Sequence, residues 1–285
     1  MRPAPFGYVA ATTIAQVCAE LAEDPAGTRI LAGGQSLMPR LVRRQERPRR
    51  LIDITRVQGL HEFVATAEAL RIGAAVTQRT AEKHAATTSF GVLAQALPWV
   101  GKVTTRNRGT VCGSLANANP AAELGVCLVV LGGEITAVSA RGERRIAAAD
   151  FFGPPGRTAL ADDELLHSVR FDRPAAGTVG RFEEVTIRGA GDTPLLSVAV
   201  SARTDDGTDL RIGLGAEGQP PTLAPHEVTA GLAGSLDDRT IDDAVQFWVA
   251  RLAFGADSRA GAQHRRRLAV NVVARQLRRL REDLP

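Results

Sequence analysis

The sequence predicts a mixed α/β (α+β) fold built in two parts, and three patterns lead to this expectation. In the first part, short apolar runs alternate with segments in which apolar residues have helical spacing. After a Gly-Pro-Pro-Gly turn at 153–156, strand-like runs are separated by turns rich in Pro, Gly and Asp. Two segments with helical spacing then close the chain. We expect a first domain over 1–176 made of two α/β subdomains. We expect a second over 177–285, with an antiparallel sheet of three or four strands and terminal helices.

The elements of the first domain follow from local patterns. Thr13, with Gln16 three residues later, forms a capping-box pattern that predicts a helix over 14–23. Asn119 as N-cap and Pro120 at the first helical position predict a helix over 121–131, which Gly132 ends. The apolar composition of this helix predicts burial on most sides. Strands are predicted at 6–9, 29–32, 51–54, 63–65, 70–74, 134–139 and 144–146, and further helices at 80–86 and 92–100.

Four strand-like runs follow the turn at 153–156, and we expect three or four of them to pair as an antiparallel sheet. They lie at 165–171, 179–187, 195–203 and 210–214. Helices are predicted at 241–252 and 259–281. The last of these mixes apolar residues at roughly helical spacing with many arginines, which predicts an amphipathic helix with a solvated or subunit-facing side.

Composition argues against several functions. The net charge is a modest +4 and only 4% of residues are aromatic, so no nucleic-acid partner is expected. The five histidines lie far apart and the three cysteines show no C-x-x-C spacing, which argues against a metal site, an iron–sulfur cluster or a disulfide framework in this chain. No apolar run approaches the ~20 residues that span a membrane, and the start lacks the apolar core of a signal peptide. We therefore expect a cytoplasmic protein without a transmembrane segment.

Two glycine-bearing segments carry most of the functional information. Ala32-Gly33-Gly34-Gln35-Ser36-Leu37 follows a short apolar run, and Asn107-Arg108-Gly109-Thr110-Val111-Cys112-Gly113-Ser114 precedes Asn119. Taken alone, Gly33-Gly34 is typical of an ordinary tight turn. If the two segments meet in space, their N–H and hydroxyl groups would form a donor-rich nest suited to a pyrophosphate. Neither has a G-x-G-x-x-G or G-x-x-x-x-G-K-[ST] fingerprint, so a dinucleotide would be held in another way.

The spacing and flanks of these segments resemble the FAD-binding medium subunit of the molybdenum hydroxylases, the family of carbon monoxide dehydrogenase and xanthine dehydrogenase. In that family an A-G-G-x-S-L loop and an R-N-x-G-T-[IV]-G-G-[NS] loop wrap the FAD diphosphate. The resemblance implies an FAD-binding domain of the vanillyl-alcohol-oxidase/PCMH type followed by the smaller second domain. It covers nearly the whole chain, through Phe6-Gly7-Tyr8, Leu51-Ile52-Asp53-Ile54, Pro120-Ala121-Ala122-Glu123-Leu124, Asp150-Phe151-Phe152, Gly191-Asp192 and Arg265-Arg266-Arg267.

The resemblance also implies which residues hold FAD, whereas it assigns no catalytic residue and no metal ligand. The two loops would hold the diphosphate, and Asn117, Ala122 and Glu123 would line the ribose and adenine end. The Val100-Gly101 pair would form an apolar wall. Leu166 and Asp192 would contact the flavin end, although a core position explains Leu166 equally well. The implied cofactor-binding set is Leu31, Ala32, Gly33, Gly34, Gln35, Ser36, Leu37, Val100, Gly101, Thr110, Gly113, Ser114, Asn117, Ala122, Glu123, Leu166 and Asp192.

Four residues depart from the family's pattern. Thr105 stands where the family often has Ile or Val before Arg-Asn, and Cys112 stands where it has a second Gly. Asn119 replaces the usual Asp, and Glu184 replaces a basic residue expected after Phe182. A thiol at Cys112 could be redox-active or form a flavin adduct, but a small buried apolar residue explains the cysteine equally well. The sequence leaves the consequences at Asn119 and Glu184 open.

By this resemblance, the expected function is the flavin module of a molybdenum hydroxylase complex. Its FAD would pass electrons from iron–sulfur centres of a small subunit, supplied by a molybdenum cofactor in a large subunit, to NAD, a quinone or oxygen. The alternative is a free-standing FAD-dependent oxidoreductase that acts directly on a small molecule. A non-enzymatic binding protein that has lost FAD is a third interpretation. The flavin spectrum of the purified chain and the subunits that accompany it would distinguish the three.

Overall fold

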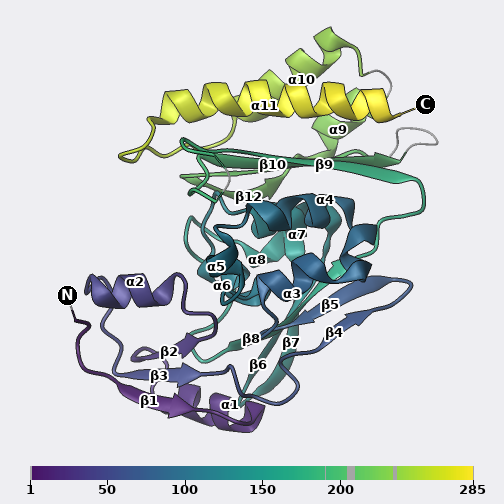
Figure 1. Ribbon diagram of the computed structural model, residues 1–285. Helices are drawn as coiled ribbons and strands as arrows, with labels where there is room; N and C mark the ends of the chain where they lie inside the picture. Colours follow the sequence, from purple (N-terminus) through teal and green to yellow (C-terminus); the bar gives the residue numbers. More distant parts are fainter. Residues whose placement is uncertain (1, 190, 204–208, 234–235, 285) are drawn as a thin grey trace.

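The computed structural model describes residues 2–189, 191–203, 209–233 and 236–284. Within these ranges the strands form three sheets (Figure 1). A small parallel sheet lies at one end, beside a five-stranded antiparallel sheet. A layer of helices separates the latter from a four-stranded antiparallel sheet, whose outer face the terminal helices cover. This arrangement confirms the predicted α+β fold class, and three of the four runs predicted for the second sheet lie in it as β9, β10 and β11.

The parallel sheet forms the N-terminal part of the molecule. Its elements, in chain order, are β1 (Gly7–Ala10), α1 (Ile14–Glu23), β2 (Thr28–Leu31), α2 (Leu37–Val42) and β3 (Arg50–Asp53). The strand order is β1-β3-β2 and both pairings are parallel. Helix α1 begins as predicted, because the Thr13 side chain accepts a hydrogen bond from the Gln16 N–H at 3.2 Å. Helix α2 was not predicted, since six residues are too few for a helical period to be visible.

The five-stranded sheet corrects one prediction. Its strands, in spatial order, are β4 (Phe63–Ala65), β5 (Ala69–Gly73), β8 (Leu165–Asp172), β6 (Gly133–Ser139) and β7 (Gly142–Ala147). The run at 165–171 was grouped with the later strands, but β8 pairs antiparallel with β5 and β6. The Glu164 carboxylate, at the start of β8, accepts hydrogen bonds from Arg144 of β7 at 2.6 and 2.7 Å. A strand-like sequence pattern predicts that a segment is a strand, but long-range contacts of this kind determine the sheet to which it belongs.

Short helices pack around the five-stranded sheet. They are α3 (Gln78–Lys83), η1 (Ala85–Ser89), α4 (Gly91–Ala96), η2 (Leu97–Trp99), α5 (Val103–Arg106), α6 (Val111–Asn117), α7 (Glu123–Leu131) and α8 (Ala148–Phe151). All nine residues of α7 are buried and Gly132 ends it at φ 78°, as predicted. The predicted N-cap Asn119 is wrong, because α7 starts later, with Ala122 as its N-cap. The Asn119 side chain instead accepts the Ala121 N–H at 3.2 Å and so forms a local turn ahead of the helix.

The C-terminal sheet has the order β12-β11-β10-β9. Its elements are β9 (Thr178–Val185), β10 (Leu196–Arg203), β11 (Arg211–Ala216) and β12 (Gln219–Leu223), followed by α9 (His226–Ala233), α10 (Asp238–Ala250) and α11 (Ala262–Asp283). Strand β12 was missed because it contains Pro220 and Pro221, which read as a turn. An edge strand tolerates proline, since its outward N–H positions need no partner. The division of the chain at 176 into two domains stays a prediction.

Strand β10 is buried on both faces, which places the C-terminal sheet between two helical layers. Leu196, Val198 and Val200 belong to the apolar cluster shared with α10 and α11. The alternate residue Ser197 faces α7, where its hydroxyl donates to the Ala121 carbonyl oxygen at 2.8 Å. On the next strand, a Cβ at Gly215 would overlap the Pro120 carbonyl oxygen, so the entry to α7 packs directly on the sheet. Figure 1 shows α7 beneath the sheet and α11 above it.

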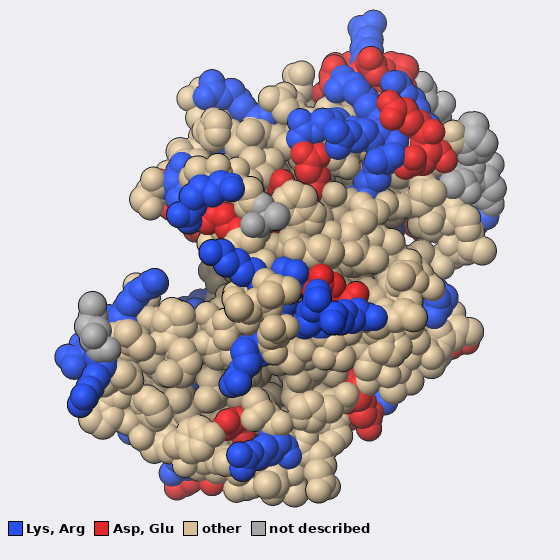
Figure 2. Space-filling model, in the orientation of Figure 1, with Lys and Arg blue, Asp and Glu red and all other residues tan. Residues whose placement is uncertain are grey.

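Most arginines of α11 are engaged within this C-terminal part. Arg275 pairs with Glu183 of β9, and Arg278 donates to Asp242 of α10 at 2.7 Å. Figure 2 shows Lys, Arg, Asp and Glu side chains interleaved over this end of the molecule. The amphipathic helix is therefore as predicted, with its arginines bridging to α10 and β9. No helix in the described ranges combines the length and the apolar character that crossing a membrane requires.

Candidate functional site

A cleft of about 720 Å³ lies between segments that adjoin all three sheets. Its walls come from both glycine-bearing segments, from the loop at 100–101, from the start of β8 and from the loop between β9 and β10. The predicted residue Leu31 is not among them and borders a neighbouring groove beside Asp53 and Arg108. The other predicted residues all line the cleft: Ala32, Gly33, Gly34, Gln35, Ser36, Leu37, Val100, Gly101, Thr110, Gly113, Ser114, Asn117, Ala122, Glu123, Leu166 and Asp192.

The two glycine-bearing segments touch at Gly33. A Cβ on Gly33 would lie 2.6 Å from Gly109 Cα and 2.8 Å from the Arg108 carbonyl carbon, which only a residue without a side chain avoids. The next residue, Gly34, has φ 72°, in the left-handed region that glycine favours. The close backbone approach therefore brings residues about 75 positions apart to one end of the cleft.

The second segment is partly helical, which corrects its prediction as a loop. Helix α6 starts at Val111, and Thr110 caps it by accepting the Gly113 N–H at 2.9 Å. The Ser114 N–H donates to the Thr110 carbonyl oxygen at 3.1 Å. These two N–H groups therefore have partners within the chain. What this segment offers a ligand is the Ser114 hydroxyl, because the missing Cβ of Gly113 makes room for the capping Thr110 hydroxyl, 2.6 Å from where that Cβ would lie.

Cys112 is a buried residue of α6. Its side chain is 2% exposed, and the thiol donates a weak hydrogen bond to the Ile72 carbonyl oxygen at 3.4 Å. Burial raises the pKa of the Cys112 thiol to about 12. Because the thiolate is the reactive form, this position favours the apolar packing role over a redox role. As an α6 residue it has a helical backbone, so the Cβ that replaces the family's glycine causes no strain here.

Three oxygen atoms in the cleft wall have no hydrogen-bond partner among the described residues. They are Thr28 Oγ1 of β2, Asn117 Oδ1 of α6 and Gln78 Oε1 of α3, and all three are buried. Buried polar groups in folded proteins are usually paired. These acceptors therefore suit a ligand that carries N–H or O–H groups.

The wall opposite the glycine segments is the loop between β9 and β10. Gly191, at φ 84°, packs against the Gly101 carbonyl, where an added Cβ would lie 3.0 Å from the oxygen. Asp192 accepts two hydrogen bonds from Arg188, at 3.2 and 2.9 Å. These bonds lower the pKa of Asp192 to about 2, so its carboxylate is ionised at neutral pH.

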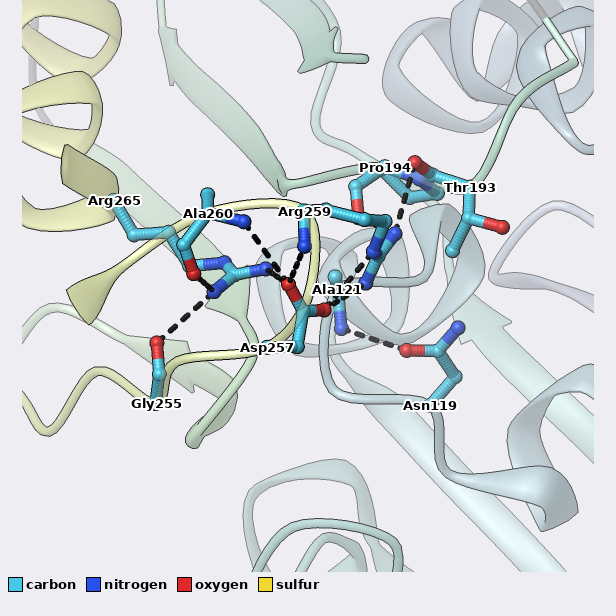
Figure 3. Close-up of polar contacts among 9 residues, drawn as sticks. All are labelled: Asn119, Ala121, Thr193, Pro194, Gly255, Asp257, Arg259, Ala260 and Arg265. Carbon is cyan, nitrogen blue, oxygen red and sulfur yellow. Dashed lines mark hydrogen bonds and ion pairs between the residues drawn. The ribbon is translucent and has the colours of Figure 1, made fainter. Parts of the chain in front are cut away.

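A cluster of charged residues from the C-terminal region contacts this wall (Figure 3). Arg259 donates to the carbonyl oxygens of Thr193 and Pro194, at 3.1 and 3.2 Å. The Asp257 carboxylate binds both Arg259 and Arg265, each at 2.7 Å. Arg265 is fully buried, so the cluster is a fixed internal support for the wall.

Sequence reasoning missed Asp257 and Arg259 and noted Arg265 only as part of a motif. No local spacing relates these residues to the loop that they support. The arginine content of the segment was the one available signal. Leu166 is 4% exposed and lines the cleft, so it has both the core position and the cleft position that the sequence left open.

Comparison with known proteins identifies relatives along nearly the whole chain. Residues 4–174 match the family described as the FAD binding domain in molybdopterin dehydrogenase, and residues 181–280 match the CO dehydrogenase flavoprotein C-terminal domain. Caffeine dehydrogenase subunit beta of Pseudomonas sp. (strain CBB1) is 31% identical over 284 residues, which cover 98% of this chain and 96% of that protein. Nicotine 6-hydroxylase medium subunit of Paenarthrobacter nicotinovorans is 30% identical over 272 residues, 94% of each chain.

Solved structures give the same result. Quinoline 2-oxidoreductase from Pseudomonas putida 86 contains a chain with a TM-score of 0.91 and 30% identity, and the match covers 99% of both chains. Reconstituted CO dehydrogenase from Oligotropha carboxidovorans contains one with a TM-score of 0.93 and 26% identity, covering 99% of this chain and 100% of that one.

Proposed function

Because the chain belongs to the FAD-binding subunits of the molybdopterin dehydrogenase family, we propose that it is the electron-transferring flavin module of a molybdenum hydroxylase complex. Its partners would be a small subunit with iron–sulfur centres and a large subunit with the molybdenum cofactor. Bound FAD would supply the redox chemistry, accepting electrons from the small subunit and delivering them to NAD, a quinone or oxygen. Full-length similarity to proteins named as medium or beta subunits supports this role.

The size and the chemistry of the cleft support FAD as its ligand. Its volume of about 720 Å³ lies within the range of small-molecule sites. The unpartnered oxygens of Asn117 and Gln78 offer acceptors, and the loop glycines leave room for a ligand to approach the backbone. Bound FAD would thus meet both polar and apolar walls.

The observation that carries the assignment of the diphosphate is the contact of Gly33 with Arg108 and Gly109. This contact puts the Gly33–Ser36 backbone and the Ser114 hydroxyl on one cleft. We assign the diphosphate to this end. Asn117, Ala122 and Glu123 would then serve the ribose and adenine, while Leu166 and Asp192 would contact the flavin. Leu31 faces the neighbouring groove and is left out of the proposed set.

Purification of the chain from its native source, with subunit and cofactor analysis, tests the function. We expect a flavin absorption spectrum and two co-purifying subunits, one with iron–sulfur centres and one with molybdenum. A yellow homomeric protein that oxidises a small molecule without further subunits would refute the complex in favour of the free-standing flavoenzyme. A colourless protein that does not take up added FAD would refute both.

A further inference from the structure

Two buried glutamates meet behind the cleft wall. Glu123 is the first residue of α7 and lines the cleft, whereas Glu184 lies on β9; each is 5% exposed. Side chains alternate along β9. Glu183 therefore faces the opposite side, where it binds Arg275 and Gln276 of α11. Phe182 packs in the inner core with α7, which places Glu184 on the inner face as well.

In the described part of the chain, no Lys or Arg forms an ion pair with either glutamate, and neither oxygen of Glu184 has a hydrogen-bond donor. The Glu184 side chain interacts with the Glu123 carboxyl. Arg106 is the positive group that acts on Glu123, but other groups occupy its guanidinium. That guanidinium donates to Glu82 at 2.8 Å and to the carbonyl oxygens of Val100 and Gly101 at 3.1 and 2.8 Å.

The other titratable groups near the pair do not help to ionise it. Asp192 adds a further negative charge near Glu184, and its own carboxylate is bound by Arg188. The Cys127 thiol of α7, next to Glu123, is buried and uncharged, because burial and the neighbouring carboxylate raise its pKa. The groups that act on Glu184 are thus negative. Arg106, the cation that acts on Glu123, and Arg188, which binds Asp192, are both already engaged.

Two carboxylates in this setting cannot both be ionised at neutral pH, since each would be buried beside a like charge. Burial, together with the charge of Glu123, raises the pKa of Glu184 to about 9. Burial also raises the pKa of Glu123, against the opposing effects of its own backbone N–H, of Glu184 and of Arg106. The proton therefore resides on Glu184, which can donate it in a hydrogen bond to Glu123.

We propose that Glu184 is a positioning residue that stays a neutral acid, donates a hydrogen bond to Glu123, and so holds the Glu123 carboxylate as an acceptor on the cleft wall. The proposal rests on the proposed function, because the ligand that Glu123 serves there is FAD. A fixed carboxylate acceptor suits O–H or N–H donors, such as the sugar hydroxyls of a dinucleotide. Ionised Glu184 would remove this hydrogen bond and add a negative charge near an anionic ligand, so affinity should fall when the proton is lost.

Infrared spectroscopy of the FAD-free full-length chain tests where the proton resides. At pH 7, the wild type should show a carbonyl band of a protonated carboxylic acid. Glu184→Gln should lack this band, and the matched control Glu183→Gln, on the opposite face of the same strand, should keep it. The wild-type band should disappear with an apparent pKa of about 9. Absence of the band at pH 7, or its persistence in Glu184→Gln, would overturn the proposal. If Glu184→Gln does not fold, the titration of the wild-type band decides.

The positioning role is tested by the FAD dissociation constant between pH 6 and 10, measured by flavin fluorescence. Glu184→Gln keeps a neutral donor, so at pH 7 its dissociation constant should lie within about threefold of the wild-type value. Above pH 9 the wild type should lose affinity by up to about tenfold per pH unit relative to Glu184→Gln. Parallel pH profiles of the two proteins would overturn the role. Failure of both to bind FAD at any pH would contradict the proposed function and the positioning role with it, while the infrared result would still locate the proton.

Discussion

Replacing Gly33 by alanine should separate the two glycine-bearing segments and weaken FAD binding. The φ angle of Gly33 is not in the left-handed region, so the substitution acts through contact and not through backbone strain. The new Cβ would lie 2.6 Å from Gly109 Cα and 2.8 Å from the Arg108 carbonyl carbon. Carbon atoms in contact prefer about 3.5–4.0 Å, so the two backbones must part by about 1 Å.

The size of the effect follows from this displacement. Overpacking against groups that cannot move aside costs about 1–3 kcal/mol. If that cost falls on the FAD-bound arrangement, the dissociation constant rises by about 5- to 150-fold. Fluorescence titration of the FAD-free chain measures this constant, and circular dichroism checks that the variant is folded.

The matched control is Gly231→Ala on α9, where an added Cβ would meet nothing within 4 Å. Its FAD affinity should equal that of the wild type. A Gly33→Ala chain that binds FAD as tightly as the wild type would refute the reasoning, because the close contact of the two segments would then have no part in the site.

Three further predictions concern the supports of the cleft. Asp257→Ala leaves the fully buried Arg265 without its carboxylate and should lower the free energy of unfolding by about 3–5 kcal/mol in urea titrations. Burial raises the pKa of Asp257, but the hydrogen bonds from Arg265 and Arg259 outweigh burial and hold this pKa below its usual range. The stabilising effect of Asp257 should therefore be lost as the pH falls through that lowered pKa. If the stability of Asp257→Ala fell with acid as much as that of the wild type, this reasoning would be contradicted. Cys112, whose pKa is raised to about 12, should react with a thiol reagent at pH 8 only after unfolding; rapid labelling of the native chain would disprove its burial. Gly215→Ala, which overlaps the Pro120 carbonyl oxygen, should lower the free energy of unfolding by about 1–3 kcal/mol, and an unchanged melting temperature would contradict it.

The parts of the fold that the sequence predicts are those governed by local interactions. Thr13 caps its helix through a residue three positions away, and Gly132 ends a helix whose apolar composition already requires burial. Short helices such as α2 were missed because they show no visible period, and other errors concern partners that lie far away in the sequence. No local sequence pattern indicates that β8 pairs with β5 and β6. The two prolines of β12 favour a turn in the sequence, although an edge strand tolerates proline.

The candidate site shows the same division. The residues of the two glycine-bearing segments could be named because a family resemblance relates them, and the structure brings them to one cleft. Arg259 reaches the Thr193 carbonyl oxygen from 66 positions away, and Glu184 of β9 meets Glu123, the first residue of α7. Such contacts depend on tertiary structure, which single-sequence patterns do not encode.

The burial of β10 between α7 and α11 bears on how this protein can evolve. A strand with no solvent-facing side chains must match both of its covering helices at once, and one of these helices belongs to the N-terminal half of the chain. A gene fragment encoding only 177–285 would expose the inner side of its sheet to water, where aggregation is the expected fate. The two halves are therefore poor candidates for exchange between related proteins. A substitution in β10 that disturbs its packing should favour a compensating substitution in α7 or α11.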